Sequence, residues 1–236
     1  MKAVVLAGGQ GTRLAPYTQI LPKPLMPIGE MPILEVLIRQ MKRHGITEII
    51  LTVGHLSHLL QSYFQDGSRY GVNIQYSREE QPLGTAGPLS LIKGLDRTFM
   101  VANGDVLTTM DMSELIDFHI KEGACATIAM HERRVKIDLG VIRLNGGLEV
   151  ENYIEKPSLD YRVSMGIYIF EPKVLEYIPK AKHLDFPDLV LKLLGEGERV
   201  MGYPYEGYWQ DLGRADDYQR AREDFEEIKV QILGKD

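Results

Sequence analysis

A glycine-rich loop that contains an arginine follows the first apolar run of the chain, and it is suited to holding a phosphate. Residues 3–7 form an uninterrupted apolar run, typical of a strand covered on both faces, and lead directly into residues 8–14. Glycines at a strand end let backbone N–H groups approach an anion closely. Residues 1–29 contain Arg13 and Lys23 and no acidic residue, although the chain has a net charge of −6. The segment therefore predicts a local positive field that binds an anionic ligand.

The spacing of these glycines differs from that of two common phosphate-binding motifs. A P-loop closes its glycine run with Lys followed by Ser or Thr, and this run has no such pair. A dinucleotide fingerprint requires G-x-G-x-x-G, whereas Gly9 and Gly11 are followed by Leu14 at the third glycine position. Without Arg13 and Lys23, a plain tight turn would explain the glycines equally well.

Asp105 has the sequence context of a metal ligand, and Asp211 is a second candidate whose context alone fits a helix cap equally well. Asp105 follows the apolar run 99–102 in an Asn-Gly-Asp turn, where a carboxylate could hold Mg²⁺ against a phosphate. Asp211 lies between Trp209 and Gly213, just before a segment with helical periodicity. Turn chemistry at Asp105 and helix capping at Asp211 are the structural alternatives.

The sequence LAGGQGTRL at 6–14, followed by LPKPL at 21–25, resembles the signature of the nucleotide-sugar pyrophosphorylases, also called sugar-1-phosphate nucleotidylyltransferases. The resemblance implies that an oxygen of a sugar 1-phosphate attacks the α-phosphorus of a nucleoside triphosphate and that pyrophosphate leaves. Such a reaction needs charge neutralisation more than a general base, because the sugar phosphate is already largely a dianion at neutral pH. The chain shows no paired-carboxylate or Ser-His-Asp signature, which agrees with this reading.

The same resemblance implies roles for individual residues. Arg13 would clamp the β- and γ-phosphates, Lys23 would contact the α-phosphate, and Asp105 and Asp211 would share Mg²⁺; these four are the predicted catalytic residues. The predicted nucleotide-binding residues are Leu6, Ala7, Gly8, Gly9, Gly11, Thr12, Arg13, Lys23, Glu80, Gly84 and Thr85.

A second motif concerns the sugar phosphate. Glu155-Lys156-Pro157 resembles the family's Glu-Lys-Pro motif, whose lysine is implied to bind the phosphate and whose glutamate contacts sugar hydroxyls. By the same resemblance, Gly140 would let the sugar approach the backbone. The family often has asparagine and alanine before a glycine where this chain has Ser164-Met165, and the Ser164 hydroxyl could still contact the sugar. Without the resemblance, a Glu-Lys pair before proline would be a solvated turn.

Residues 79–89, EEQPLGTAGPL, resemble the family's base-recognition loop, and LGTAGPL is most similar to mannose-1-phosphate guanylyltransferases. A carboxylate such as Glu80 could accept hydrogen bonds from guanine, whereas an amide such as Gln81 suits uracil or thymine better. The loop therefore favours GTP with mannose or heptose 1-phosphate. The alternatives are a UTP-, dTTP- or CTP-dependent enzyme of the same family, or a non-catalytic regulatory subunit that binds a nucleotide sugar.

The elements that must position these residues alternate between strand and helix. Strand patterns lie at 3–7, 48–53, 72–76 and 98–102, and helical patterns at 33–43, 55–64 and 86–93. This alternation predicts an α/β fold with a Rossmann-like, mostly parallel central sheet and helices on both faces. Ligands bind beyond the carboxyl ends of strands in such sheets. We therefore expect the loop at 8–13 and the turn at 103–105 to share one crevice.

The second half predicts an appended mixed α+β lobe that binds the sugar. Strand patterns lie at 124–131, 140–144, 148–154, 166–170 and 199–203, and helical patterns at 113–121, 172–178, 185–195 and 215–228. Asn145-Gly146 between two of these strands is a hairpin signal. We expect a single nucleotidyltransferase domain over 1–236, with a nucleotide-binding lobe at 1–109 and a sugar-phosphate-binding lobe at 110–236.

Composition limits the remaining possibilities. With 44% hydrophobic and 25% charged residues, the chain is typical of a globular protein. It has neither a signal-sequence pattern nor an apolar run of about 18 residues, so we expect a cytoplasmic protein without a membrane partner. Negative charge without a long basic run argues against nucleic acid as a partner. A single cysteine, Cys125, cannot form an internal disulfide. The oligomeric state is left open, a homo-oligomer included.

Overall fold

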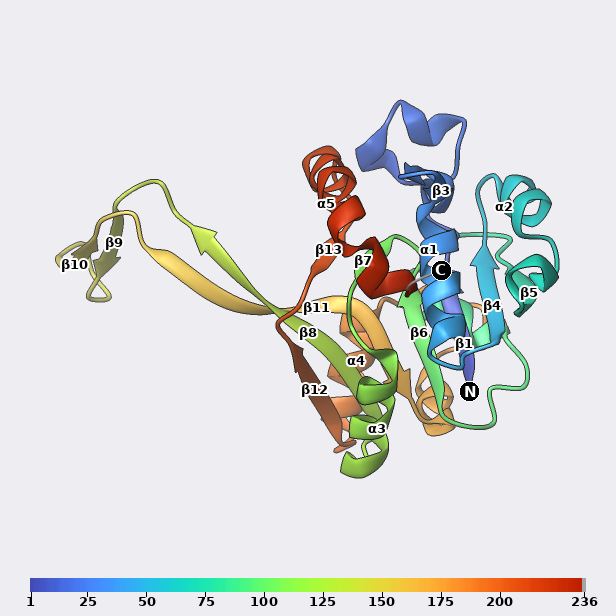
Figure 1. Cartoon of the computed structure of the whole chain (residues 1–236). Helices are drawn as coiled ribbons and strands as arrows, with labels where there is room; N and C mark the ends of the chain where they lie inside the picture. The colour runs from blue at the N-terminus through green and yellow to red at the C-terminus, as the bar shows by residue number, and fades with distance from the viewer. Residues whose placement is uncertain (235–236) are drawn as a thin grey trace.

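The structure, a computed structural model, describes residues 1–234 and is built around one large sheet (Figure 1). Within these residues the sheet has seven strands in the order β12-β8-β11-β6-β1-β4-β5. They are β1 (Lys2–Leu6), β4 (Glu48–Val53), β5 (Asn73–Arg78), β6 (Phe99–Asn103), β8 (Ala126–Lys136), β11 (Ser158–Phe170) and β12 (Val200–Tyr205). All neighbouring pairs are parallel except the two made by β11, which runs antiparallel to β6 and β8. The predicted mostly parallel sheet is confirmed.

The carboxyl ends of the central strands lie level with one another. Leu6, the last residue of β1, is in register with Thr52 of β4 and with Asn103 of β6. The apolar residues of β1 and β6 are almost fully buried, because both faces of these strands are covered. The loops that follow β1 and β6 therefore leave the sheet at the same edge.

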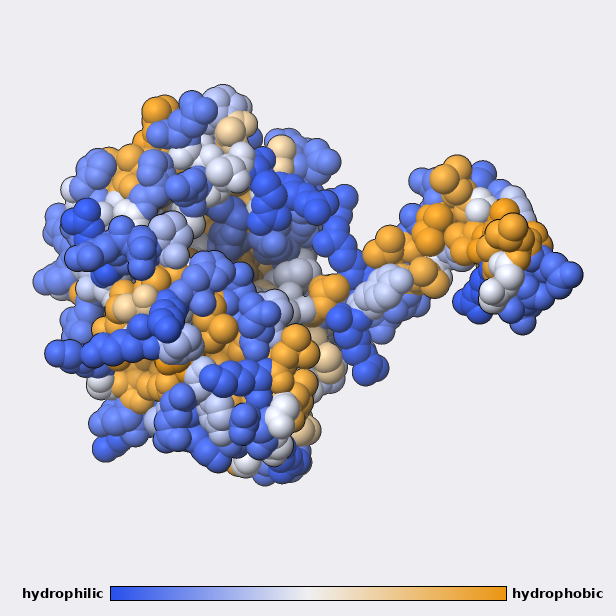
Figure 2. Space-filling view, turned by 180° about the vertical axis from the view of Figure 1, so that it is seen from behind, coloured by the Kyte–Doolittle hydropathy of each residue, from blue (hydrophilic) through white to orange (hydrophobic). Residues whose placement is uncertain are grey.

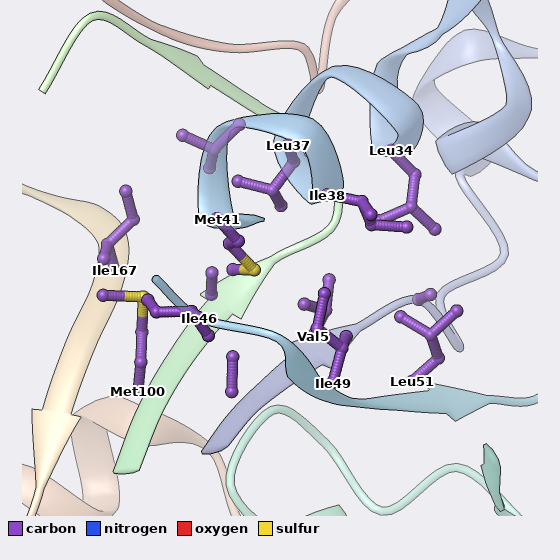
Figure 3. Packing of buried hydrophobic residues seen from close by; sticks show 14 of the residues in the cluster. Val5, Leu34, Leu37, Ile38, Met41, Ile46, Ile49, Leu51, Met100 and Ile167 are labelled. Atoms are coloured by element: carbon purple, nitrogen blue, oxygen red, sulfur yellow. The ribbon is translucent and has the colours of Figure 1, made fainter. Parts of the chain in front are cut away.

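Helices cover both faces of the sheet, as the alternation predicts. The helices α1 (Ile33–Arg43), α2 (Ser57–Phe64) and α3 (Met112–Glu122) pack on one face, and α4 (Phe186–Gly195) packs on the other. Figure 3 shows Leu34, Leu37, Ile38 and Met41 of α1 packed over side chains of the sheet that include Val5, Ile49 and Leu51. Their spacing of three and four residues gives α1 the apolar stripe that this packing needs.

The last helix, α5 (Ala215–Leu233), lies outside α1 and not on the sheet. Its Phe225 and Ile228 pack with Ile33 and Val36, on a second apolar side of α1. Four short strands make two small ladders beside it: β2 (Pro27–Ile28) with β3 (Met31–Pro32), and β7 (Val106–Thr108) with β13 (Trp209–Asp211). The second ladder matters for the site described below.

A long ribbon of two strands extends away from the sheet (Figure 1). It is the outer part of β8 and β11, and it continues into the hairpin β9 (Val141–Leu144) and β10 (Val150–Ile154), where the predicted Asn-Gly turn lies between the strands. The predicted strand at 166–170 is too short, since β11 begins at Ser158. Residues 158–163 alternate between polar and apolar side chains, and this alternation is itself a strand signal.

Two predicted α-helices are short 3₁₀-helices in the structure. The segments predicted at 86–93 and 172–178 are Gly87–Leu91 and Pro172–Tyr177. Each begins with a proline in its first turn, and each is short, which is the usual setting of a 3₁₀-helix. Throughout residues 1–234, no helix combines the length and apolar composition needed to span a membrane.

Candidate active site

The glycine-rich loop lies where β1, β4 and β6 end together. A Cβ on Gly54 would lie 3.0 Å from the carbonyl oxygen of Gly8, and a Cβ on Gly104 would lie 2.9 Å from the carbonyl oxygen of Leu6. The N–H of Gly104 donates to the carbonyl of Leu6 at 2.9 Å, which joins the two turns. The close approach of these backbones requires glycine, and the two turns share one crevice as expected.

A cavity of about 670 Å³ opens at this edge of the sheet. Its volume is within the range of cavities that hold ligands of nucleotide size. All the residues predicted to bind the nucleotide line this cavity, and so does Asp105. The predicted residues in its lining are Leu6, Ala7, Gly8, Gly9, Gly11, Thr12, Arg13, Lys23, Glu80, Gly84, Thr85 and Asp105.

The two predicted metal ligands lie close together because β7 pairs with β13. Asp105 directly precedes β7, and Asp211 is in register with Val106. The N–H of Leu212 donates to the carbonyl of Asp105 at 3.1 Å, which fixes the two segments to each other. The side chain of Lys23, a residue only 8% exposed, forms an ion pair with Asp105, and its Nζ lies 3.8 Å from Oδ1 of Asp211.

Arg13 belongs to the same cluster. A Cβ on Gly213 would lie 3.0 Å from Nη2 of Arg13 and 3.0 Å from Oδ1 of Asp211, so the glycine leaves room for both side chains. The structure thus brings together the four predicted catalytic residues, two cations and two carboxylates, at one side of the cavity. Their individual roles stay predictions.

The environment of Asp211 disfavours its ionised form. Burial raises its pKa above the usual carboxyl value, and the negative charge of Asp105 adds to this; Lys23 and Arg13 oppose the shift without cancelling it. Since the folded protein holds this proton more tightly than the unfolded chain, the contribution of Asp211 to stability is fully present below its usual pKa. That contribution is lost as the pH rises through the raised pKa. At neutral pH the ionised carboxylate therefore lowers the free energy of unfolding.

Asp211→Asn is accordingly expected to raise the melting temperature at pH 7 slightly, because solvent screens the charge of a side chain that is 46% exposed. The amide is neutral, so it removes the charge that burial and Asp105 oppose. Thermal melts monitored by circular dichroism at neutral pH and at about pH 4 would test this, because the gain should shrink where the wild-type carboxyl is protonated. Asp216→Asn, in the exposed first turn of α5, is the matched control and should give no such gain. A lower melting temperature for Asp211→Asn at neutral pH would contradict the assignment.

The carboxylates of this cluster suit a magnesium ion. Within residues 1–234, no group of three or more His, Cys, Asp or Glu side chains converges into a complete metal site. Mg²⁺ is commonly held by one or two carboxylates, however, with phosphate oxygens and water as the other ligands. Asp105 and Asp211 both lie against the ammonium of Lys23, so the cluster already accommodates positive charge between them.

Thr85 fixes the predicted base-recognition loop to α4. Its backbone N–H donates to Oδ1 of Asp185 at 2.9 Å, and its hydroxyl accepts from the N–H of Phe186 at 2.8 Å. A Cβ on Gly84 would lie 2.6 Å from the carbonyl oxygen of Leu184, so the loop packs tightly there. Glu80, in contrast, is exposed beside the cavity. Thr85 therefore positions the loop, a role that the sequence did not indicate.

The residues predicted to contact the sugar phosphate are not brought to this cavity. Gly140, Glu155 and Lys156 lie on the projecting ribbon, and Ser164 lies at its base, where its hydroxyl donates to the Tyr168 hydroxyl at 2.9 Å. Gly140 packs directly against the ring of Tyr153, where any larger side chain would clash, so packing alone explains why this residue is glycine. The Nζ of Lys156 lies 4.0 Å from Glu155, and its φ of +45° is unusual for a residue with a side chain.

Several residues of the cavity were not predicted from the sequence. Thr52, Gly54, His55 and Arg78 lie outside every segment that the sequence indicated as part of the site, whereas Gln10, Pro24, Glu79, Gln81, Pro82, Pro88 and Asn103 lie in such segments but are not among the predicted site residues. Burial raises the pKa of Glu79, whose Oε2 accepts from the N–H of Leu83 at 3.0 Å. Many of them follow or end a parallel strand, so the rule that ligands bind beyond carboxyl ends would have found them had it been applied to β4 and β5.

The cavity at the glycine-rich loop, with basic and acidic side chains beside it, is suited to binding a phosphate ester together with a divalent cation. A model of the nucleotidyl transferase family matches residues 2–228, and the chain belongs to this family. The family predicted from the sequence is thus confirmed.

Relatives within the family carry different substrate names. The chain is 36% identical to a UTP–glucose-1-phosphate uridylyltransferase of Synechocystis, over 94% of this chain and 62% of the relative. It is 35% identical to a mannose-1-phosphate guanylyltransferase of Mycobacterium tuberculosis, over 94% of this chain and 64% of the relative. The chain thus spans less than two thirds of the length of these curated relatives.

Solved structures share the whole fold. A crystal structure from Bacillus anthracis, assigned as a glucose-1-phosphate thymidylyltransferase, superposes with a TM-score of 0.77 at 26% identity and covers 94% of each chain. This agreement confirms the α/β fold class of the chain.

Proposed function

We propose that this chain transfers a nucleotidyl group from a nucleoside triphosphate to a sugar 1-phosphate, with Mg²⁺ as cofactor, giving a nucleotide sugar and pyrophosphate. The observation that carries the proposal is the cluster of Arg13, Lys23, Asp105 and Asp211 beside the cavity at the glycine-rich loop. The named activities of the Synechocystis and Mycobacterium relatives belong to this reaction class.

The chemistry needs cations more than a base. A sugar phosphate has its second pKa near 6, so its attacking oxygen carries charge and a lone pair at neutral pH. A bond forms from this oxygen to the α-phosphorus, and the bond from the α-phosphorus to the bridging oxygen breaks as pyrophosphate leaves. Lys23 would hold the α-phosphate and Arg13 the departing β- and γ-phosphates, which lets two anions approach each other.

The acidic pair has a complementary role. Asp105 and Asp211 would hold Mg²⁺, which supplies positive charge at the α-phosphate when it is bound. Both carboxylates now lie against Lys23. A triphosphate in the cavity would offer the ammonium of Lys23 phosphate oxygens as new partners, so that the carboxylates become available to the metal.

For the substrates, we propose GTP with mannose 1-phosphate or heptose 1-phosphate. The LGTAGPL loop and the exposed Glu80 support this, as do relatives named mannose-1-phosphate guanylyltransferase at 33–36% identity. UTP with glucose 1-phosphate is the second candidate, because the amide of Gln81 also lines the cavity and the Synechocystis relative is a uridylyltransferase.

A release assay tests the proposal directly. The protein is incubated with each of the common triphosphates and a panel of sugar 1-phosphates, and pyrophosphate is measured with and without Mg²⁺. We expect release with at least one pair, and most with GTP and mannose or heptose 1-phosphate. No release with any pair, together with tight binding of a nucleotide sugar by calorimetry, would favour a non-catalytic binding subunit instead.

Lys156→Ala is expected to raise the KM for the sugar phosphate by about tenfold or more, because one charge-assisted contact to the phosphate is lost. The KM for the nucleotide should change little. Steady-state kinetics with each substrate varied in turn would measure both values. Lys136→Ala, an exposed lysine on the same ribbon, is the matched control and should leave both constants unchanged. Equal effects on the two substrates would show that the role of Lys156 is wrong.

A further inference from the structure

The ribbon of residues 132–163, called the arm below, stands apart from the rest of the described chain (Figures 1 and 2). The last pairing of β8 with β12 joins His131 to Tyr205, and β6 pairs with β11 only from Ile167 onward. Among residues 1–234, no strand therefore pairs with either outer edge of the arm. Strands with free edges are prone to associate with another chain.

One face of the arm is apolar and exposed. On its two long strands, Val135 is in register with Leu159, and Tyr161 follows on the same side. At its tip, Ile142 faces Tyr153 across the β9–β10 ladder, and these side chains are 53% and 60% exposed. Figure 2 shows apolar residues gathered along the arm and at its tip. Such one-sided alternation is typical of a sheet whose apolar face is covered.

On the two long strands of the arm, the opposite face is polar. Arg134 forms a two-pronged ion pair with Asp160 there, with N–O distances of 2.8 and 3.2 Å. The arm as a whole has six basic and six acidic residues, so it is neutral in a chain of net charge −6. A neutral, apolar strip does not match a strongly charged partner, and it suits an apolar protein surface.

The cavity lacks the residues predicted to bind the sugar phosphate, and the arm carries some of them. The cavity lining consists of residues 6–105, and no residue of the arm is among the described residues that line it. Glu155 and Lys156, the pair assigned to the sugar phosphate, lie on the arm. The cavity therefore contains the residues predicted to bind the nucleotide, and the arm carries residues predicted to bind the sugar phosphate.

The arm is also poorly suited to fold back onto its own cavity. Its ladder runs without a break from the pair Ser158–Lys136 to the pair Ser164–Met130. These six residue steps hold the tip roughly 20 Å beyond the sheet. Closing the arm onto its own cavity would require breaking or sharply bending this hydrogen-bonded ladder.

We infer that the arm of one copy of this chain covers the cavity of a second copy, and that the exchange is reciprocal. Each active site would then contain Arg13, Lys23, Asp105 and Asp211 from one copy and Glu155 and Lys156 from the other. The inference rests on the proposed function for the role of Lys156. A two-fold axis makes the two contacts identical and closes the assembly as a dimer.

An apolar rim beside the cavity offers a receiving surface. The segment 15–21 carries Tyr17 and Ile20, which are 65% and 80% exposed. The segment is fixed to the glycine-rich loop because the hydroxyl of Thr18 donates to the carbonyl of Gly11 at 2.8 Å. Apolar side chains at the rim of one copy and on the arm of the other would cover each other. This matching of two surfaces of the same chain is the reason to expect a second copy and not an unrelated protein.

Mixing two defective proteins tests the exchange. Lys156→Ala damages only the arm, and Asp105→Asn damages only the cavity. After dissociation and reassociation in equal amounts, half of the dimers are mixed, and each mixed dimer has one site with an intact cavity and an intact arm. At low sugar phosphate, Lys156→Ala alone should keep about a tenth of wild-type activity or less and Asp105→Asn almost none, and we expect the mixture to give about a quarter. Mixing Lys156→Ala with the double variant Asp105→Asn/Lys156→Ala is the control and should restore nothing.

Two measurements that do not need activity complete the test. Wild-type protein should sediment as a dimer, Ile142→Asp should sediment as a monomer, and Asn152→Asp, which adds the same charge on the other face of the tip, should remain a dimer. A photo-crosslinking phenylalanine analogue at position 153 should join two copies through the cavity or the 15–21 rim. The inference would be overturned by wild-type protein that sediments as a monomer, by Ile142→Asp protein that remains a dimer, or by a cross-link that forms within one copy. It would also be overturned if wild-type protein is active but the mixture of Lys156→Ala with Asp105→Asn shows no restored activity. If wild-type protein lacks transfer activity, the proposed function fails, and sedimentation and cross-linking still decide the exchange.

Discussion

Asp105→Asn is expected to reduce transfer by at least about a thousandfold, or ~4 kcal/mol of transition-state stabilisation, while the protein stays folded. The substitution keeps the shape of the side chain and removes the charge that would hold Mg²⁺ next to Asp211. It also removes the partner of the buried Lys23, so a modest loss of stability is expected. Initial rates of pyrophosphate release and a thermal melt of the same sample would measure the two effects separately.

Asp111→Asn is the matched control for this experiment. Asp111 is the N-cap of α3, where its Oδ1 accepts from the N–H of Ser113 at 2.8 Å, and asparagine caps helices about equally well. This variant should retain activity and lose little stability, although the Asp111 carboxylate also contacts Nδ1 of His44 at 3.0 Å. Substantial transfer by Asp105→Asn, with no added dependence on the Mg²⁺ concentration, would remove Asp105 from the metal site.

Lys23→Met should be comparably damaging, for a different reason. Without the ammonium, Asp105 and Asp211 face each other with no cation between them, and the pKa of Asp211, which Lys23 lowers, should rise further. The α-phosphate also loses its predicted partner. We expect kcat to fall by about a thousandfold, with a smaller change in the KM for the sugar phosphate. Steady-state kinetics over a range of Mg²⁺ concentrations would measure this.

Lys2→Met is the control for the loss of a lysine. Lys2 is the first residue of β1, the strand that leads into the glycine-rich loop, so it lies at the opposite end of the strand from the loop. Its Nζ donates to the carbonyl of Gly94 at 2.6 Å. Its loss should leave kcat unchanged. If Lys23→Met kept near-normal kcat and altered only stability, Lys23 would be a purely structural counterion of the two aspartates.

Local sequence predicted well which loops line the cavity. The apolar run before Gly8 and the run before Asp105 identify buried strands, and parallel strands end at one edge of a sheet. The convergence of these loops with Arg13 and Lys23 therefore follows from short-range signals and one general rule.

The position of Asp211 required more than local signals. It depends on the pairing of β7 with β13, two strands of three residues each that are about a hundred positions apart. Strands this short have no detectable periodicity, so the sequence suggested Asp211 only through the family resemblance.

For the arm, the sequence predicted the local strands in part but not where they lie in the molecule. Its strands were predicted in part, since the Asn145-Gly146 turn and the alternation in 148–154 mark a hairpin. The direction in which that hairpin leaves the sheet depends on how far β11 continues to pair with β8, which is a tertiary property. The sequence therefore identified Glu155 and Lys156 as a pair but not their distance from the cavity.

The pairing of β13 with β7 also has a consequence for synthesis of the chain. Residues 1–109 hold the glycine-rich loop, Lys23 and Asp105, yet Asp211 joins them only after the ribosome has added about a hundred further residues, because it reaches them through the pairing of β13 with β7. A nascent chain would present an anion-binding pocket long before it could complete the acidic pair. If the proposed function holds, transfer would thus begin only after β13 has paired with β7, since the acidic pair is incomplete before that.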